Sequence, residues 1–495
     1  MATHAGTHLR LDNLRWARCI PNGVVRLIQP FESLIVLGPL AFLMFVAYRG
    51  FSVILFAPIA AMGAVLLIDP TLVAPMFTGL FMDKMVGFVK NFFPVFLLGA
   101  IFGKVIELSG FSKSIVASVI QLIGRDRAIL AIVVVCAILT YGGVSLFVVV
   151  FAVYPFAAEM FRQGKIPKRL IPGTIALGAF TFTMDSLPGT PQIQNIIPTT
   201  FFKTDIYAAP ILGVIGATFI LICGIAYLEG CRRRAAAAGE GYGEGHTNEP
   251  ERFEQENLAH PLIAILPLVM VGVMNKVFTN AISRLYGETV SFIPAVIGTA
   301  APIVQQTKAV AAIWAVEGAL LLGIATVFVF AWKSVLAKFS EGSKVAIGGA
   351  LLATMNTASE YGFGAVIAAL PGFRVVAHAL SAIPNPLVNE AITVTALAGI
   401  TGSASGGMGI ALAAMAETFI ASAHASGIPL EVFHRVASMA SGGMDTLPHN
   451  GAVITLLAVT GLTHRQSYKD IFAITLIKTL AVFGVIAIYY ATGLV

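Results

Sequence analysis

Apolar residues occur along this chain in long runs, separated by short polar segments. An α-helix needs about 20 apolar residues to cross a bilayer, so these runs predict an all-α polytopic membrane protein with about 11–13 transmembrane segments. The predicted segments lie near 33–49, 50–68, 86–108, 126–140, 170–200, 207–229, 259–277, 289–306, 309–331, 346–370, 388–401, 436–462 and 471–492. Those at 170–200 and 436–462 are interrupted.

One polar segment, residues 230–258, is much longer than the others and divides the chain in two. It begins with three arginines and continues through a Gly- and Glu-rich stretch, which is typical of a cytoplasmic linker. The predicted organisation is a cytoplasmic N-terminal tail (1–32), a first membrane repeat (33–229), the linker (230–258) and a second membrane repeat (259–495). The tail lacks a compact apolar core with a cleavage site, so we do not interpret it as a signal peptide.

Composition agrees with this interpretation and adds one feature. Charged residues make up 11% of the 495 residues and apolar residues 57%, whereas a soluble domain carries about 25% charged residues. A large soluble enzyme is therefore excluded, and the net charge of +6 reflects basic loops rather than a nucleic-acid surface. The 48 Gly and 24 Pro exceed what simple membrane helices need.

The two halves contain an internal repeat. The sequence Met184-Asp185-Ser186-Leu187-Pro188 returns as Met444-Asp445-Thr446-Leu447-Pro448. Upstream of each copy lie an Ile-Pro pair and, further upstream, a tip rich in Gly and Ser, at 142–145 and 402–407. Each half therefore contains a predicted re-entrant hairpin followed by an interrupted helix.

The charges of equivalent loops indicate that the two repeats have opposite topology. Residues 161–170 contain four basic side chains, whereas the matching residues 422–435 contain one Arg, one Glu and two His. Since Lys and Arg accumulate on cytoplasmic loops, the copies are predicted to be inverted with respect to each other. Inverted repeats with interrupted helices are a transporter architecture, and the interruptions mark the substrate site.

The interruptions define the candidate site. Pro188, Pro191 and Pro448 remove backbone donors, so unwound backbone is expected at mid-membrane depth. Free N–H groups at half-helix N-termini suit an anionic carboxylate. The predicted substrate-binding residues are Gly142, Gly143, Ser145, Ser186, Thr190, Gln192, Asn195, Ser403, Ser405, Thr446, His449 and Asn450.

Three acidic residues are candidates for holding a coupling ion: Asp185, Asp445 and Glu317. A carboxylate repels an anionic substrate until a proton or a cation neutralises it, which is a physical basis for symport. Alternatives remain: the two aspartates as helix caps, the Gly and Ser tips as helix contacts, and Glu317 in a structural ion pair. The sequence has no Cys/His metal spacing and no Walker, GxSxG or HExxH motif, so neither an enzyme, a metal site nor a cofactor is expected.

With hairpin tips at 142–145 and 402–407 and interrupted elements at 184–195 and 444–451, the chain resembles the ion-transporter superfamily over residues 30–495. Within it, the chain is most similar to the gluconate:proton symporter family and its citrate and short hydroxy-acid relatives. The resemblance implies a scaffold, a mobile transport portion, elevator-type movement and a homodimer. The sodium-coupled dicarboxylate branch carries Ser-Asn-Thr at its tips, where this chain has Gly-Gly-Val-Ser and Gly-Ser-Ala-Ser.

The sequence therefore predicts a permease in the bacterial inner membrane, with a cytoplasmic N-terminus, that imports a small carboxylate by proton symport. The expected substrates are gluconate or a short hydroxycarboxylate such as 3-hydroxybutyrate, because relatives of this variant are associated with such acids. A sodium-coupled citrate or dicarboxylate symporter and a cation/proton antiporter are the alternatives on the same scaffold. A membrane receptor would need a soluble output domain, and the longest polar segment is only the 230–258 linker.

Overall fold

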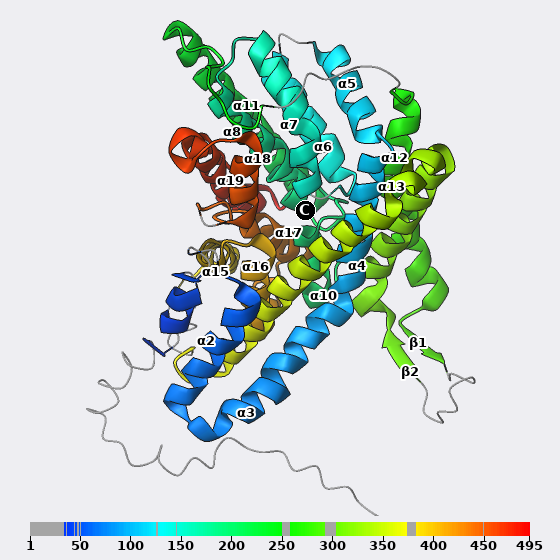
Figure 1. Ribbon diagram of the computed structural model, residues 1–495. Helices are drawn as coiled ribbons and strands as arrows, with labels where there is room; N and C mark the ends of the chain where they lie inside the picture. The colour runs from blue at the N-terminus through cyan, green and yellow to red at the C-terminus, as the bar shows by residue number, and fades with distance from the viewer. Residues whose placement is uncertain are drawn as a thin grey trace, which may run out of the picture.

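The computed structural model describes residues 34–495 except for gaps at 36, 44, 47–48, 50, 125–126, 145, 250–257, 293–302, 374–382 and 449. The predicted N-terminal tail therefore lies outside the described residues. Figure 1 shows a helical molecule in which two long helices, α4 (Met82–Leu108) and α13 (Thr307–Ala369), run side by side. Within the described ranges, six helices are long and apolar enough to cross a membrane.

The first part of the chain builds a scaffold of long helices. Helix α2 (Val53–Ile68) precedes a continuous helical segment, Pro70–Leu108, in which a 3₁₀ turn, α3 (Val73–Met76) and one π-helical stretch lead into α4 (Met82–Leu108). Helix α5 (Phe111–Ile123) then connects this scaffold to the first hairpin.

The first hairpin and the first interrupted helix occur where the sequence predicts them. Helices α6 (Ala128–Tyr141) and α7 (Leu146–Gln163) form the two arms of the hairpin. After a 3₁₀ turn at Lys168–Leu170, the interrupted helix consists of α8 (Ile171–Ala179), the single turn α9 (Phe182–Asp185) and α10 (Ile193–Phe202). The repeat ends with α11 (Pro210–Ala237), which continues eight residues past the predicted boundary at 229.

The second half has the same order of elements. Helices α12 (Pro261–Tyr286) and α13 (Thr307–Ala369) belong to the scaffold, α15 (Pro386–Thr401) and α16 (Ala404–Ser426) form the second hairpin, and α17 (Leu430–Ser441) and α18 (Gly451–Thr460) form the second interrupted helix. Helix α19 (His464–Thr492) completes the repeat.

Two details of the predicted spans in this half are wrong. The two described ends of the predicted span 289–306 are strands: β1 (Thr289–Phe292) pairs antiparallel with β2 (Ile303–Gln306), because these stretches are rich in β-branched residues. The predicted spans 309–331 and 346–370 are joined, since the charged residues between them are helical, and α13 has one break, at Ala331 (φ −135°).

Equivalent helices of the two repeats run antiparallel. At one end of the α11–α19 pair, the backbone N–H of Ile211 lies 3.4 Å from the carbonyl of Val495, and at the other end Tyr227 donates to Asp470. In the scaffold, a Cβ on Gly342 of α13 would lie 2.9 Å from Leu108, and one on Gly362 would lie 2.9 Å from the Phe81 carbonyl. The repeats therefore have inverted topology, as predicted.

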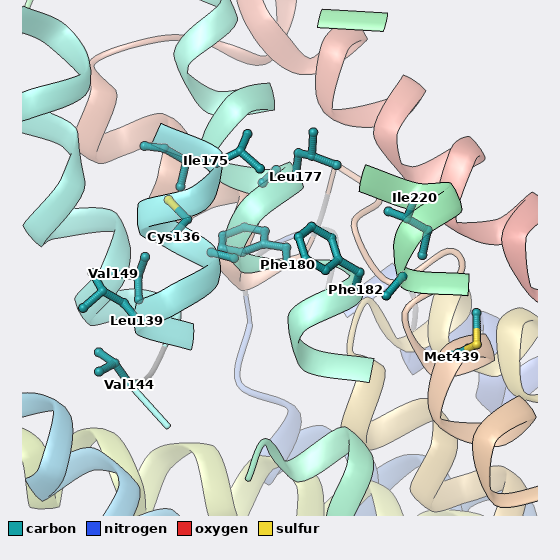
Figure 2. Close-up of a cluster of buried hydrophobic side chains, with 14 of the residues drawn as sticks. Cys136, Leu139, Val144, Val149, Ile175, Leu177, Phe180, Phe182, Ile220 and Met439 are labelled. Carbon is teal, nitrogen blue, oxygen red and sulfur yellow. The ribbon is translucent and has the colours of Figure 1, made fainter. Parts of the chain in front are cut away.

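A large apolar core joins the first hairpin to the first interrupted helix. Figure 2 shows Cys136 and Leu139 of α6 beside Ile175 and Leu177 of α8, with Phe180 and Phe182 at the break. These side chains are almost fully buried. Because helix packing in a membrane depends on van der Waals contacts, the close packing of these side chains holds the unwound segment in place.

Two of the charges counted in the sequence prediction of inverted topology are not exposed loop charges. Lys168 is fully buried and pairs with Glu249 of the linker at 2.7 Å, and Arg435 is fully buried between the two interrupted helices. The prediction of opposite topology was right, but part of the charge pattern behind it has a structural origin.

Candidate functional site

The first helix break is held open by residues that cannot continue a helix. Pro188 and Pro191 lack an N–H donor, and Gly189 adopts φ +82°, a conformation that side chains rarely allow. Tyr141, at the end of the hairpin arm α6, donates its hydroxyl to the Pro188 carbonyl at 2.8 Å. The break is therefore fixed against its own hairpin, and α10 begins again only after Gln192.

The second break is fixed in the same way. Asn450 caps α18 by accepting a hydrogen bond from the Val453 N–H at 2.9 Å, and its amide donates to the Gly402 carbonyl in the hairpin tip at 2.7 Å. In the first repeat, the Gln192 amide donates to the Thr140 carbonyl at the end of α6 at 2.7 Å and to the Val144 carbonyl in the hairpin tip at 3.3 Å. Thus the residue before each second half-helix contacts the tip of its own hairpin. Neither Asp185 nor Asp445 occupies such an N-cap position.

The two predicted aspartates converge on one lysine. The ammonium of Lys478 pairs with Asp445 Oδ1 at 2.6 Å and donates to the Phe180 carbonyl of the first break at 3.1 Å. Asp185 accepts a hydrogen bond from Ser186 at 2.7 Å. A Cβ on Gly442 would lie 2.1 Å from Asp185 Oδ2 and 3.4 Å from the Lys478 ammonium, so both breaks meet at this place.

A second buried cation lies beside this group. Arg435, on α17, donates to the Asp185 carbonyl at 3.1 Å, to Asn195 Oδ1 at 3.0 Å and to the Ala208 carbonyl at 2.8 Å. His434 lies 3.2 Å from the same Asn195 oxygen. These contacts join the second interrupted helix to the first. Buried charges need such partners, because an unpaired ion inside a protein is costly.

A cavity of about 730 Å³ lies between the scaffold and the first break. Its polar lining consists of Gln192, Gln194, Asn356, Thr357 and Ser405, with Lys104 and Glu107 on α4. Both hairpins reach it, through Gly143 and Ser405. The remaining lining residues are mainly apolar side chains of α4, α7, α9, α10, α13 and the first break, namely Val95, Phe96, Leu146, Val148, Phe151, Met184, Pro191, Ile193, Leu320, Val345 and Leu352.

Three of the predicted substrate-binding residues, Gly143, Gln192 and Ser405, line this cavity. Five others lie in the surrounding framework, where Ser186 donates to Asp185 and Asn450 donates to the Gly402 carbonyl. Asn195 donates to the Thr190 and Ile206 carbonyls, Ser403 accepts from the Gly406 N–H at 3.0 Å, and the Thr446 hydroxyl bonds to that of Thr475.

The other predicted residues have different surroundings. Thr190 is buried, and its hydroxyl has no hydrogen-bond partner among the described residues. Gly142 is in contact with Leu268 of α12. Glu317, on α13, is half-buried and does not line the cavity. Ser145 and His449 lie outside the described residues.

The sequence prediction missed Lys478, Arg435 and His434. A signal for Lys478 was present, because a single Lys inside the apolar segment 471–492 needs a partner in a membrane. Arg435 was counted as a loop charge because it lies close to the polar segment before α17. Gln194, Asn356 and Thr357 have no such signal; only the folded structure brings them to the cavity.

Comparison with known proteins gives one relative with high identity. The chain is 61% identical over 473 residues to the uncharacterized transporter YxjC of Bacillus subtilis (strain 168), covering 94% of this chain and all of that protein. No family model matches the chain. Among solved structures, the YdaH transporter of Alcanivorax borkumensis, described as having an unusual topology, gives a TM-score of 0.48 at 13% identity, covering 93% of this chain and 98% of that one.

Proposed function

The chain belongs to the same transporter family as Bacillus subtilis YxjC, and from this premise we propose that it is a secondary active transporter for a small organic anion. The observation that carries the proposal is the cavity between the scaffold and the first break. Two helix N-termini border the cavity. The half-helix α10 contributes Gln192 and Gln194, and the hairpin helix α16 contributes Ser405. Helix N-termini offer N–H groups and a positive dipole end, which suit a carboxylate.

The lining of the cavity favours one class of carboxylate. Gluconate carries a hydroxyl on nearly every carbon, and each buried hydroxyl without a partner costs about 1–3 kcal/mol. The polar groups are few, and the amides of Asn195 and Asn450 already bond to backbone carbonyls. A short hydroxycarboxylate such as 3-hydroxybutyrate places its carboxylate and single hydroxyl on the polar residues and its methyl end on the apolar wall. We therefore propose this class ahead of gluconate.

We propose that the proton is the coupling ion and that Asp185 and Asp445 carry it. The Lys478 ammonium occupies the place between the two breaks where a metal cation would contact Asp445. Sodium would have to displace the Lys478 ammonium from this place. A proton only has to neutralise the aspartate, which weakens the attraction between the aspartate and Lys478. Glu317 remains a weaker candidate, because it does not border the cavity.

The proposed setting is the bacterial inner membrane, with the N-terminus in the cytoplasm and two copies forming a homodimer. Import of the anion together with a proton is driven by the inward proton gradient. Because the anion and the proton together have no net charge, the membrane potential does not oppose their entry. The two alternatives on the same fold are sodium-coupled symport of citrate or a dicarboxylate and cation/proton antiport.

Uptake into proteoliposomes tests the proposal. Purified protein is reconstituted, and uptake of labelled 3-hydroxybutyrate, gluconate and citrate is measured under an imposed pH gradient, an imposed sodium gradient, or neither. The proposal expects 3-hydroxybutyrate uptake that follows the pH gradient and is independent of sodium. Uptake of citrate that depends on sodium would support the first alternative. A pH change driven by a cation without any organic acid would support antiport.

A further inference from the structure

Glu360 is a buried acidic residue at the contact between the scaffold and the second hairpin. It lies on α13, is 3% exposed, and its Oε2 atom has no hydrogen-bond partner among the described residues. A Cβ on Gly406, in the first turn of α16, would lie 1.6 Å from that oxygen. The carboxyl group is therefore in direct contact with the N-terminal turn of α16, and only a glycine leaves room for it.

No opposite charge compensates Glu360. In the part of the chain that the structure describes, its carboxyl forms no ion pair with any Lys, Arg or His side chain, whether on α13 itself or on the helices packed against α13 and α16, namely α2, α4, α10, α12, α15 and α17. The Ser403 hydroxyl, which accepts a hydrogen bond from the Gly406 N–H at 3.0 Å, forms none with Glu360 Oε2. Among the described residues, the favourable electrostatic contribution to an anion here is the partial positive charge of the α16 N-terminus.

A helix N-terminus compensates a buried carboxylate much less than the loss of water costs. A neutral carboxyl avoids that cost and can act as a donor itself. We propose that Glu360 is a proton-binding site that is occupied while the second hairpin tip is docked on α13, and that loss of this proton releases the tip. The site is separate from Asp185 and Asp445, and it does not depend on the identity of the transported anion.

The position of Glu360 connects this proton to the cavity. One turn earlier on α13, the Thr357 hydroxyl lies 3.2 Å from the Ser405 hydroxyl, and both residues line the cavity. Separation of α16 from α13 breaks this contact and admits water to both the cavity and Glu360. Because the docked state binds the proton more tightly than the open state, a higher pH favours the open state.

Cross-linking across this contact measures docking directly. Thr357→Cys and Ser405→Cys are introduced into a chain in which the four native cysteines are replaced by alanine. The disulfide yield is measured from pH 6 to pH 9 (about one unit at a time) in the chain with Glu360 and in Glu360→Gln. Dividing the first yield by the second removes the pH dependence of the thiols, which both chains share. The proposal expects the ratio to fall with rising pH, by up to about tenfold per unit for one proton. A ratio that is constant with pH would overturn it.

Matched variants separate proton binding from packing. Glu360→Asp keeps a carboxyl and is expected to keep the pH dependence. Gly406→Ala displaces the carboxyl and is expected to abolish it. On the same helix, Gly409 has its nearest neighbour, Tyr361, 3.6 Å away, and Glu417 is exposed, so Gly409→Ala and Glu417→Gln are controls that should behave like the parent chain.

If Glu360→Gln does not fold, the comparison of Gly406→Ala with Gly409→Ala decides in its place. Equal pH dependence in these two variants would overturn the proposal. Because the readout is a disulfide, it remains valid even if uptake measurements reject the proposed substrate or proton symport.

Discussion

The two helix breaks carry equivalent aspartates but different charge partners. Asp445, in the second break, forms an ion pair with Lys478, whereas Asp185, in the first break, has a hydrogen bond from Ser186 and no ion pair within 4 Å among the described residues. Both buried cations next to the breaks, Lys478 and Arg435, come from the second repeat. The inverted symmetry of the backbone therefore does not extend to the charges.

The cavity is equally asymmetric. It is bordered by Met184, Pro191 and Gln192 of the first break, whereas the described residues of the second break do not line it. Together with the proposed function, this comparison assigns the two breaks different roles. The first break contacts the substrate, and the second break, through the Asp445–Lys478 ion pair, holds the buried charges. Each prediction below tests one side of this division.

The largest effect is expected for Lys478→Met. It leaves Asp445 without its ion pair and removes the donor to the Phe180 carbonyl, so the variant should lose about 3–5 kcal/mol of stability. Thermal unfolding in detergent measures this loss. Lys469→Met, an exposed position on the same helix, is the control and should unfold like the parent. Equal stability of Lys478→Met and the parent would mean that Lys478 does not hold the two breaks together.

The next prediction compares the aspartates themselves. Asp445→Asn leaves a buried ammonium without an anion within ion-pair distance and should cost nearly as much as Lys478→Met, with loss of uptake. Asp185→Asn keeps an oxygen that can accept from Ser186, and it should cost less than about 1.5 kcal/mol.

The double variant Asp445→Asn/Lys478→Met should be more stable than the sum of the two single losses requires, because it removes both charges of the pair. If the stability losses of the two single variants simply added in the double variant, or if Asp185→Asn and Asp445→Asn lost equal stability, the two breaks would not differ in their charge partners as proposed.

Much of this arrangement could be predicted from sequence, because it rests on local rules. The Met-Asp-Ser/Thr-Leu-Pro repeat located both breaks, and the proline and glycine content predicted their unwound backbone. The partners of Asp185 and Asp445 could not be found in this way, because Lys478 lies 33 residues after Asp445 and Arg435 lies 250 residues after Asp185. Only packing of α17 and α19 against the first break brings these side chains together.

The lengths of the helices also could not be predicted fully from the sequence. Residues 332–345 contain charged side chains and look like a loop, yet they continue α13, because a helix that extends beyond the apolar region can be solvated there. In contrast, the apolar run 289–306 fits a predicted span, yet its described ends, 289–292 and 303–306, form strands, so apolar content alone does not give the type of element.

A smaller effect is expected at the two residues that hold the hairpin tips. Gln192→Ala and Asn450→Ala each lose a hydrogen bond to a tip carbonyl, with an expected cost of about 1–2 kcal/mol. If only the first break contacts the substrate, Gln192→Ala should raise KM for uptake, whereas Asn450→Ala should leave KM unchanged and lower stability alone. A higher KM in Asn450→Ala would contradict the proposed division.

The smallest effect concerns the linker, where Glu249 pairs with Lys168 and with Arg162. Burial raises the pKa of Glu249, but the hydrogen bonds from Lys168 and Arg162 outweigh it, so the pKa lies below its ordinary value. The ion pairs therefore stabilise the docked linker above about pH 4.3 and are lost as the pH falls through the lowered pKa.

The hydrogen-exchange protection factors of residues 240–249, which correct for the slower intrinsic exchange in acid, should therefore fall on acidification, and Glu249→Gln should show the lower protection already at neutral pH. The expected change is about 1 kcal/mol or less, because the pairs are partly exposed. Exchange in Glu249→Gln that equals the parent at neutral pH would show that these ion pairs do not hold the linker.

The central claim, that a small hydroxycarboxylate enters together with a proton, is tested most directly by proton movement itself. Proteoliposomes containing a trapped pH-sensitive dye receive external 3-hydroxybutyrate in sodium-free buffer, with Asp445→Asn liposomes as the control for passive entry of the acid. The account predicts internal acidification in the parent that exceeds the control and saturates with substrate concentration. Acidification equal to that of the control, or acidification that appears only when sodium is added, would contradict it.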